Sequence, residues 1–516
     1  MPTVPLSAPA EPRDEPARAT TARLPRTAGA AARIAWALVA IAFAVAILVG
    51  AGWRIVGSAL PHAHPDEPIV VGVGRQLDWS LDTNWRHAPG LPAPFGETDQ
   101  YNFSAYILFA NATFDGAAAA LGLPRDDAAR LAALRAISLG LGLALIGMAA
   151  WLARRLGADR FGAAAAAALV ALSPSLVMDS LYARPETFVC CLSVGFCLAA
   201  SAPRRRWRSA LAAALLCGLL VATKISFLPL LPFLLIAVAP IGRRDGAAIA
   251  AGFVLGVCLG MPQAVLHPRE FIAGAAFLAR FYHDAGGYPH GLGPAAPWPS
   301  RLLYGAVWTR ETWGLWPPLG AGLGAAALLR ERRRREALLC LPFVLTMVYF
   351  WGEPLFFERN FSPSLVVLAA LFGRGVCWLR SRCETVASAP LPALVVGAAV
   401  AAALWTPALT SARVFDALAS AGSRAQRADA QAMALATRYG APVARLGWGA
   451  LPDDCRPGQL VEVFASGGVV PRPLPPAWRE VGRDKSLFEN DIPSTLQAYL
   501  SRTVIWLRCA GPREAD

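Results

Sequence analysis

The chain has 516 residues, of which 55% are hydrophobic and 16% charged, and its formal net charge is +13. Together with a mean hydropathy of +0.43, this composition excludes an ordinary soluble domain and indicates a polytopic membrane protein. The positive charge does not indicate nucleic-acid binding, because the arginines gather in short loops between apolar runs, so we expect no nucleic-acid partner.

Residues 1–32 are rich in Ala, Pro, Thr and Arg and show no apolar periodicity, which predicts a disordered basic tail. About eleven apolar runs follow, which we interpret as transmembrane helices, although several are short or contain proline. The membrane domain that they form covers residues 33–409. The runs occupy residues 35–56, 131–152, 161–182, 186–202, 209–223, 225–241, 247–266, 312–329, 337–351, 361–379 and 391–408.

The placement of arginine predicts the orientation of these spans. If the N-terminus is cytoplasmic and each run crosses once, five arginine-bearing loops fall on the cytoplasmic side, as the positive-inside rule requires. Only two lysines, Lys224 and Lys485, stand against many Arg, Ala and Pro residues, a bias typical of a GC-rich bacterial genome. We therefore expect a multi-pass protein of the bacterial inner membrane. The five loops contain Arg154–Arg160, Arg204–Arg208, Arg243–Arg244, Arg330–Arg335 and Arg380–Arg382.

Two long loops, residues 57–130 and 267–311, then face the outside, and so does a polar tail. The first loop has amphipathic stretches, which we expect to lie on the membrane surface. We expect residues 410–516 to form a small extracytoplasmic α/β domain, in which Cys455 and Cys509 can pair if the domain lies outside the cytoplasm. The amphipathic stretches are Ile69–Leu77 and Phe103–Phe114, and the tail elements are a helix over Ser411–Tyr439 and strands over Val443–Leu446, Val461–Phe464 and Thr503–Leu507.

An acidic pair, Asp66 and Glu67, follows the first span at the outer membrane surface. Ordinary solvation does not require two adjacent carboxylates there, whereas a reaction on a lipid-borne substrate would. The alternative is a helix cap, in which Asp66 or Glu67 starts an interfacial helix over Ile69–Leu77. The residues alone leave both interpretations open.

Two cations are expected at the same membrane depth as Asp66. Lys224 lies at an outer boundary, against the charge bias, and is a candidate point charge for a phosphate; the alternative is snorkelling to the interface. Arg359 precedes the tenth span, where a helix N-terminus adds positive potential and suits an anion; the alternative is a local pair with Glu358.

Other polar residues are candidates for the lining of a pocket. Arg184 and Glu186 form a tight outer turn and either pair with each other or help to shape the pocket. Tyr282 and His283 lie in the second long outer loop, where aromatic residues either contact sugar or lipid or anchor the chain at the interface. The histidines of this loop match no standard zinc spacing, so no metal ligand is assigned, and a divalent metal stays an open alternative.

Several short motifs occur in a fixed order, and together they resemble a known family. They resemble the bacterial polytopic glycosyltransferases of the GT-C fold, the protein O-mannosyltransferase-like (family 39) group, over about residues 35–380. The motifs are His64-Pro65-Asp66-Glu67, Leu81-Asp82-Thr83-Asn84-Trp85-Arg86, Tyr101-Asn102-Phe103-Ser104-Ala105-Tyr106, Leu172-Ser173-Pro174, Asp179-Ser180-Leu181-Tyr182-Ala183, Ala222-Thr223-Lys224 and Glu358-Arg359-Asn360-Phe361-Ser362-Pro363.

Together with the apolar runs and the pattern of the tail, the resemblance gives the expected fold class: an all-α polytopic membrane protein, GT-C-like, with about eleven transmembrane helices and a small C-terminal α/β extracytoplasmic domain. It also implies transfer of a sugar from a polyprenyl phosphate in the membrane to an acceptor that is a protein, a glycolipid or a polysaccharide. Asp66, with Glu67 beside it, would be the catalytic acidic residue, and Lys224 and Arg359 would bind the lipid phosphate. Tyr101, in the third motif, is a further candidate for the pocket.

The chemistry agrees with these residue types. A sugar that leaves a phosphate needs a base for the incoming hydroxyl and cations on the departing phosphate. No nucleotide-binding motif is present, and a lipid-phosphate donor requires no cofactor of that kind. The alternative from another class is a transporter or flippase of lipid-linked saccharides, which should place its ionisable groups near the middle of the membrane.

Overall fold

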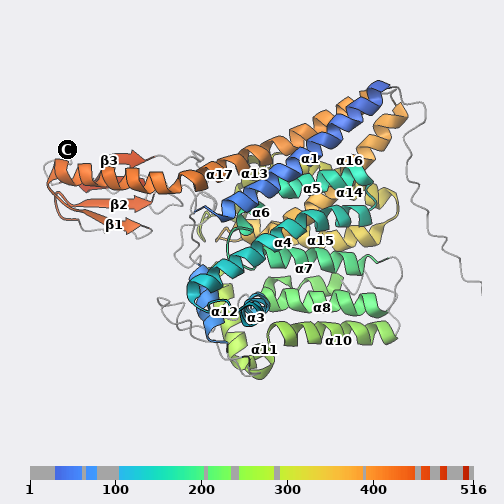
Figure 1. Cartoon of the computed structure of the whole chain (residues 1–516), viewed down its shortest axis with the longest axis horizontal. Helices are drawn as coiled ribbons and strands as arrows, with labels where there is room; N and C mark the ends of the chain where they lie inside the picture. Colours follow the sequence, from blue (N-terminus) through green and yellow to red (C-terminus); the bar gives the residue numbers. More distant parts are fainter. Residues whose placement is uncertain are drawn as a thin grey trace, which may run out of the picture.

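The computed structural model of the chain describes residues 30–60, 66–77, 79, 104–202, 207–233, 243–283, 291–386, 391–447, 455–464, 477–484 and 504–510. Within these ranges, helices pack side by side into a bundle, and a small region of strands projects from it (Figure 1). The expected fold class, a helical membrane protein with a small C-terminal region of helix and strands, is confirmed.

Long apolar helices form the body of the bundle. In the described part of the chain, five helices are long and apolar enough to cross a bilayer. Shorter apolar helices pack against them and against one another, and each of these helices overlaps an expected span, while the total of about eleven spans stays a prediction. The five are α1 (Ala30–Ser58), α4 (Asp127–Arg155), α15 (Arg334–Gly352), α16 (Ser362–Val386) and the first part of α17 (Leu391–Tyr439); the shorter ones include α5 (Arg160–Leu172), α7 (Glu186–Ala200) and α8 (Trp207–Thr223).

Small residues let neighbouring helices approach closely. A Cβ atom on Gly256 of α10 (Arg243–Gly260) would lie 2.3 Å from the carbonyl oxygen of Leu215 in α8, so only glycine permits this contact. The same kind of contact joins α14 (Trp316–Arg330) to α16. Close backbone packing of this kind holds helices together where lipid removes the hydrophobic drive for association.

One expected span is broken. Residues 161–182 were expected to form one helix, but α5 ends at Leu172 and the short helix α6 (Pro174–Asp179) continues after Ser173. Proline lacks an N–H group and its ring clashes with the carbonyl four residues earlier, which favours a break at Pro174. A tight turn follows α6 and ends where α7 begins at Glu186.

The connections between the spans contain more helix than the sequence predicted. In the first long loop, α2 (Glu67–Arg75) starts two residues before the expected Ile69, and α3 (Ser104–Leu121) extends beyond the expected Phe114. In the second, α12 (Pro268–His283) and α13 (Trp298–Trp313) were not predicted as helices. Three short helices complete the connections: η1 (Ile225–Phe227), α11 (Gln263–Leu266) and η3 (Glu358–Phe361).

The last helix crosses the expected domain boundary at residue 410. We expected a span over 391–408 and a separate helix over Ser411–Tyr439, but α17 is one helix of 49 residues with Pro407 inside it. The hydroxyl groups of Thr410 and Ser411 donate to the carbonyls of Glu311 and Leu172, so this part of α17 is fixed to the bundle.

The tail ends in a four-stranded sheet with the order β1-β2-β4-β3. β1 (Val443–Gly447) and β2 (Leu460–Phe464) pair in parallel, and the other neighbours are antiparallel. Three strands match expected ones, whereas β3 (Trp478–Asp484) was missed, because its alternation carries charged residues and a glycine; the fourth is β4 (Val504–Cys509). The expected disulfide between Cys455 and Cys509 is present.

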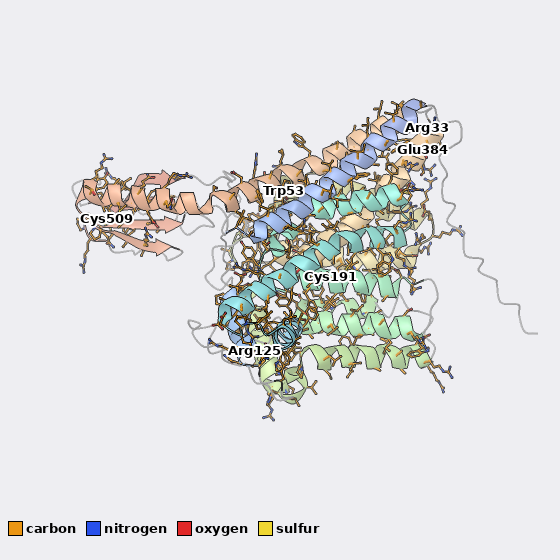
Figure 2. The ribbon with its side chains drawn as sticks, in the orientation of Figure 1. Arg33, Trp53, Arg125, Cys191, Glu384 and Cys509 are labelled. Atoms are coloured by element: carbon orange, nitrogen blue, oxygen red, sulfur yellow. A yellow bond between two sulfur atoms is a disulfide. The ribbon has the colours of Figure 1, made fainter. Side chains whose placement is uncertain are left out.

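The bundle has two distinct ends. Arg33, at the start of α1, and Glu384, near the end of α16, lie toward one end, while Cys509 lies in the sheet beyond the other (Figure 2). Arg380 lies over the ring of Trp36, near the start of α1, and donates to Asp159, while Arg333 donates to the carbonyl of Arg155. Described members of three arginine clusters thus lie at the end marked by Arg33, which we call the arginine-rich end. Since α1 leads away from that end, residues that follow Ser58 lie at the opposite end, which we call the distal end.

Candidate active site

Asp66 lies at the distal end, at the start of α2. It occupies the N-cap position, but its side chain makes no capping hydrogen bond. Instead, its Oδ2 atom is 3.7 Å from Nε of Arg184 and 3.5 Å from Nη2 of Arg359. The side chain of Asp66 is 19% exposed, so the carboxylate can still be reached from outside the protein. The helix-cap alternative is thus right that a helix starts here, at Glu67, but the side chain of Asp66 does not cap it.

A buried carboxylate joins two of the cations. Oε1 of Glu186 accepts hydrogen bonds from Nη2 of Arg184 at 2.9 Å and from Nζ of Lys224 at 3.2 Å. The side chain of Glu186 is fully buried. Arg184 and Glu186 thus do pair with each other, as one interpretation had it, and Arg184 also reaches Asp66, which joins this pair to the rest of the site.

Lys224 points into the protein. Its ammonium group also donates to Oδ1 of Asn360 at 3.4 Å, and the residue is 9% exposed. The snorkelling alternative is therefore wrong. Burial lowers the pKa of Lys224 below its ordinary value, although the nearby Glu186 acts in the opposite direction.

Asn360 and Tyr282 close one side of the site. Nδ2 of Asn360 donates to the hydroxyl of Tyr282 at 3.1 Å, and Tyr282 lies on α12, in the second long loop. Burial raises the pKa of Tyr282, so this hydroxyl keeps its proton at neutral pH and remains able to donate. The guanidinium carbon of Arg359 lies 4.1 Å from the centre of the Phe357 ring, a cation–π contact that helps to fix its position.

We call this group the Asp66 cluster; it contains Asp66, Arg184, Glu186, Lys224, Tyr282, Arg359 and Asn360. Three side chains are cationic and two are acidic, so the cluster carries an excess of one positive charge when all five are ionised. Its charged side chains are at most 19% exposed, which strengthens electrostatic interactions with a bound anion. An excess of positive charge beside one accessible carboxylate suits a phosphate and a group that must lose a proton.

Glu67 differs sharply from its neighbour. Both of its carboxylate oxygens accept hydrogen bonds from Arg135 of α4, at 2.8 and 2.6 Å, and Oε1 also accepts the backbone N–H of Ala183 at 2.9 Å. The residue is 3% exposed. The sequence placed Glu67 in the catalytic pair as a supporting neighbour of Asp66, and a buried carboxylate held in this way fits such a role, because it fastens α2 to α4 and to the turn before α7.

Two candidate residues are not part of the cluster. His283 ends α12 and is exposed, and no described hydrogen bond or ion pair connects it to Asp66. Tyr101 lies outside the described residues. Within the described ranges, no three His, Cys, Asp or Glu side chains gather as a metal site would require. The cations beside Asp66 also disfavour a divalent metal there.

Two residues of the site were missed from the sequence. Arg135 lies inside an apolar run, and an ionisable residue in a membrane span is itself a signal of function or of a buried partner. Asn360 lies within the motif that begins at Glu358, but an uncharged amide at this position did not mark it as a site residue. Its contacts with Lys224 and Tyr282 join residues 136 and 78 positions apart, which no local pattern predicts.

Comparison with known proteins gives one family match. Residues 125–243 match the family model described as dolichyl-phosphate-mannose-protein mannosyltransferase. This segment, under a quarter of the chain, includes Arg135, Arg184, Glu186 and Lys224 but neither Asp66 nor Arg359. No curated protein sequence matches the chain significantly.

Solved structures of two membrane enzymes are similar to the chain. The apo oligosaccharyltransferase of Archaeoglobus fulgidus is 14% identical, with a TM-score of 0.48, over 73% of this chain and 55% of that one. The chain thus spans about half the length of that enzyme. ArnT from Cupriavidus metallidurans bound to undecaprenyl phosphate is 14% identical, with a TM-score of 0.47, over 92% of this chain and 99% of that one. With TM-scores below 0.5, neither likeness carries an argument about activity.

The family match confirms, over residues 125–243, the resemblance that the sequence motifs indicated. Residues 125–243 therefore carry a likeness to a mannosyltransferase family, within a chain whose described part contains five helices long and apolar enough to cross a bilayer.

Proposed function

We propose that the protein transfers a sugar from a polyprenyl-phosphate donor to an extracytoplasmic acceptor, with inversion at the anomeric carbon. The observation that carries this proposal is the Asp66 cluster, in which one accessible carboxylate lies 3.5 Å from Arg359 and joins, through Arg184 and Glu186, to Lys224. The distal end then faces away from the cytoplasm, in the inner membrane of a bacterium.

Asp66 acts as the general base. The acceptor hydroxyl attacks the anomeric carbon of the donor, and its proton passes to the carboxylate of Asp66. Arg184 holds this carboxylate in place from the turn before α7. Because the attack and the departure occur on opposite faces of the sugar in one displacement, the configuration at the anomeric carbon inverts.

Lys224 and Arg359 bind the donor phosphate. As the bond between the anomeric carbon and the phosphate oxygen breaks, its electron pair stays on the polyprenyl phosphate, whose negative charge increases. Cations fixed beforehand stabilise this charge in the transition state without having to reorganise. Arg359 contacts Asp66, so the base and the phosphate site share one side chain.

Glu67 supports this geometry without touching the substrate. It fixes the first turn of α2, which carries Asp66, to Arg135 and to the N–H of Ala183. A base held on rigid elements by buried contacts of this kind stays close to its productive position.

The proposal is tested by sugar transfer with purified protein. Radiolabelled polyprenyl-phosphate sugars are incubated with the protein in lipid vesicles and with a native membrane extract. Label should appear on an acceptor with the wild type and with the exposed control Asp127→Asn, but not with Asp66→Asn. If labelled lipid instead crosses the vesicle membrane intact and no acceptor is labelled, the protein is a flippase and the proposal is wrong.

A further inference from the structure

The break between α5 and α6 exposes backbone carbonyls inside the bundle. In a continuous helix, the carbonyl of Val170 would accept the N–H of residue 174, but that residue is a proline and has none, so the backbone donor that remains for it is the N–H of Ser173, at a long 3.4 Å. The carbonyls of Ala171 and Leu172 likewise belong to the last turn of α5, where helices leave their acceptors unsatisfied. Such groups need other donors, because a membrane offers no water to replace them.

Arg54 of α1 supplies most of these donors. Its Nη2 donates to the carbonyl of Val170 at 2.9 Å, and its Nη1 donates to that of Ala171 at 2.5 Å. Nη1 also donates to Gly50, one turn earlier in its own helix, at 2.9 Å. Arg54 is fully buried, so its guanidinium group is committed to this end of α5.

Other elements complete the same arrangement. Ser411 of α17 donates to the carbonyl of Leu172 at 2.6 Å, and Trp313 of α13 donates to the hydroxyl of Ser173 at 2.9 Å. A Cβ atom on Gly50 would lie 2.2 Å from the carbonyl oxygen of Ala171, so only glycine lets α1 approach the break. Three helices from distant parts of the sequence, α1, α13 and α17, therefore donate hydrogen bonds to the break between α5 and α6.

The interruption leads directly to the Asp66 cluster. After the break, α6 ends with Asp179, which accepts the hydroxyl of Ser362 at the start of α16. The next residues form the turn whose Ala183 N–H binds Glu67 and whose Arg184 contacts Asp66. A shift of α6 would therefore move the contacts that fix the base and its arginine.

We propose that Arg54 is a positioning residue for the transfer reaction: by replacing the donors lost at the α5–α6 break, it holds α6 and the turn to Arg184 in the arrangement that places Asp66. The inference rests on the proposed function. A buried guanidinium in a membrane span is costly, and an apolar contact between α1 and an unbroken α5 would need none.

The test compares two buried arginines that serve the same structural purpose at opposite ends of the bundle. Arg374 of α16 is also buried; it donates to the carbonyl of Gly157, just after the end of α4, at 3.2 Å and also pairs with Glu331. It lies twelve residues beyond Ser362, roughly 18 Å along the helix at 1.5 Å per residue. Arg54→Met and Arg374→Met each remove a guanidinium and keep an apolar side chain of comparable length.

Arg54→Met should lower kcat by about 100-fold, the usual effect of a misplacement of about 1 Å in an active site, with the donor KM changed less than about threefold. Arg374→Met should keep kcat close to that of the wild type at a similar loss of thermal stability. In the Asp66→Asn background, Arg54→Met should cause almost no further loss, because the group that it positions has already been removed.

Equal losses of kcat in both methionine variants, or a full additional loss on top of Asp66→Asn, would show that Arg54 only stabilises the fold and would overturn the inference. If Arg54→Met does not fold, Ser411→Ala replaces it in the same comparison, since it removes one hydrogen-bond donor from the same break. A loss of kcat from Ser411→Ala that adds in full to the loss from Asp66→Asn would again overturn the inference. Normal turnover of Asp66→Asn alone would refute the proposed function, and the inference with it.

Discussion

At the scale of single residues, the two carboxylates of one acidic pair have separate roles. Asp66 is partly exposed and faces two guanidinium groups, whereas Glu67 is buried and bound by Arg135 and a backbone N–H. The sequence predicted that both matter, because adjacent carboxylates at a membrane surface have no role in solvation. It also favoured Asp66 as the base and Glu67 as a supporting neighbour, but it could not predict which group holds Glu67, since Arg135 lies 68 positions away.

Removal of either donor-site cation should weaken use of the donor. Lys224→Ala and Arg359→Ala each remove a charge-assisted contact, worth about 1.5–3 kcal/mol, so the donor KM or kcat/KM should change by roughly 10- to 100-fold. Steady-state kinetics with a labelled polyprenyl-phosphate sugar measure this. The exposed control is Arg310→Ala, whose guanidinium pairs only with the neighbouring Glu311 among the described contacts. Unchanged kinetics in both alanine variants would show that these cations do not bind the donor.

The lowered pKa of Lys224 predicts how activity depends on pH. The protein needs the charged ammonium, and burial makes it lose its proton at a lower pH than an ordinary lysine does. Therefore kcat/KM should fall on the alkaline side as pH rises through this lowered pKa. In Lys224→Arg, whose guanidinium stays charged, the fall should move to higher pH. An identical alkaline limb in both proteins would assign it to another group.

Glu67→Gln tests the positioning role. It keeps the size of the side chain but replaces one charge-assisted acceptor with an amide, so the contact with Arg135 weakens. We expect a loss of thermal stability and a fall in turnover smaller than that of Asp66→Asn. Arg135→Met should behave in the same way, and the double variant should lose little more than either alone. Abolished turnover in a Glu67→Gln protein of normal stability would instead assign catalysis to Glu67.

At the scale of elements, hydropathy predicted most of the spans, and local chemistry explains the exceptions. Pro174 divides an expected span into α5 and α6. The motif Leu172-Ser173-Pro174 was noted in the sequence, but the break in the helix at its proline was not predicted. The continuity of α17 through Pro407 was missed, because a proline after an apolar run usually indicates an end. What keeps α17 in place includes a contact of Ser411 with Leu172, 239 positions away, which sequence periodicity does not reveal.

At the scale of the whole molecule, the bundle separates its charges between two ends. The arginine-rich end carries Arg155, Arg333 and Arg380, from three clusters that the positive-inside rule assigns to the cytoplasm, and the distal end carries the Asp66 cluster. The sequence predicted that Asp66, Lys224 and Arg359 share a membrane depth, and the structure does bring these residues together. Their convergence depends on helix packing, which the order of the spans alone does not determine.

The orientation can be measured directly. Reporter fusions at Arg333 should indicate the cytoplasm, and fusions at Gly440, after α17, should indicate the opposite side. A cytoplasmic signal at Gly440 would contradict the orientation and would separate the sheet domain from the outer face.

The most direct test of the account is the turnover of Asp66→Asn with a polyprenyl-phosphate sugar and its acceptor, measured beside Asp127→Asn. Asparagine keeps the size of the side chain but cannot accept the proton, so kcat should fall by about two to four orders of magnitude, the usual contribution of a positioned base. Binding of the donor should change little, and Asp127→Asn, which alters an exposed carboxylate paired with Arg75, should behave as the wild type. Near-normal turnover of Asp66→Asn would contradict the account.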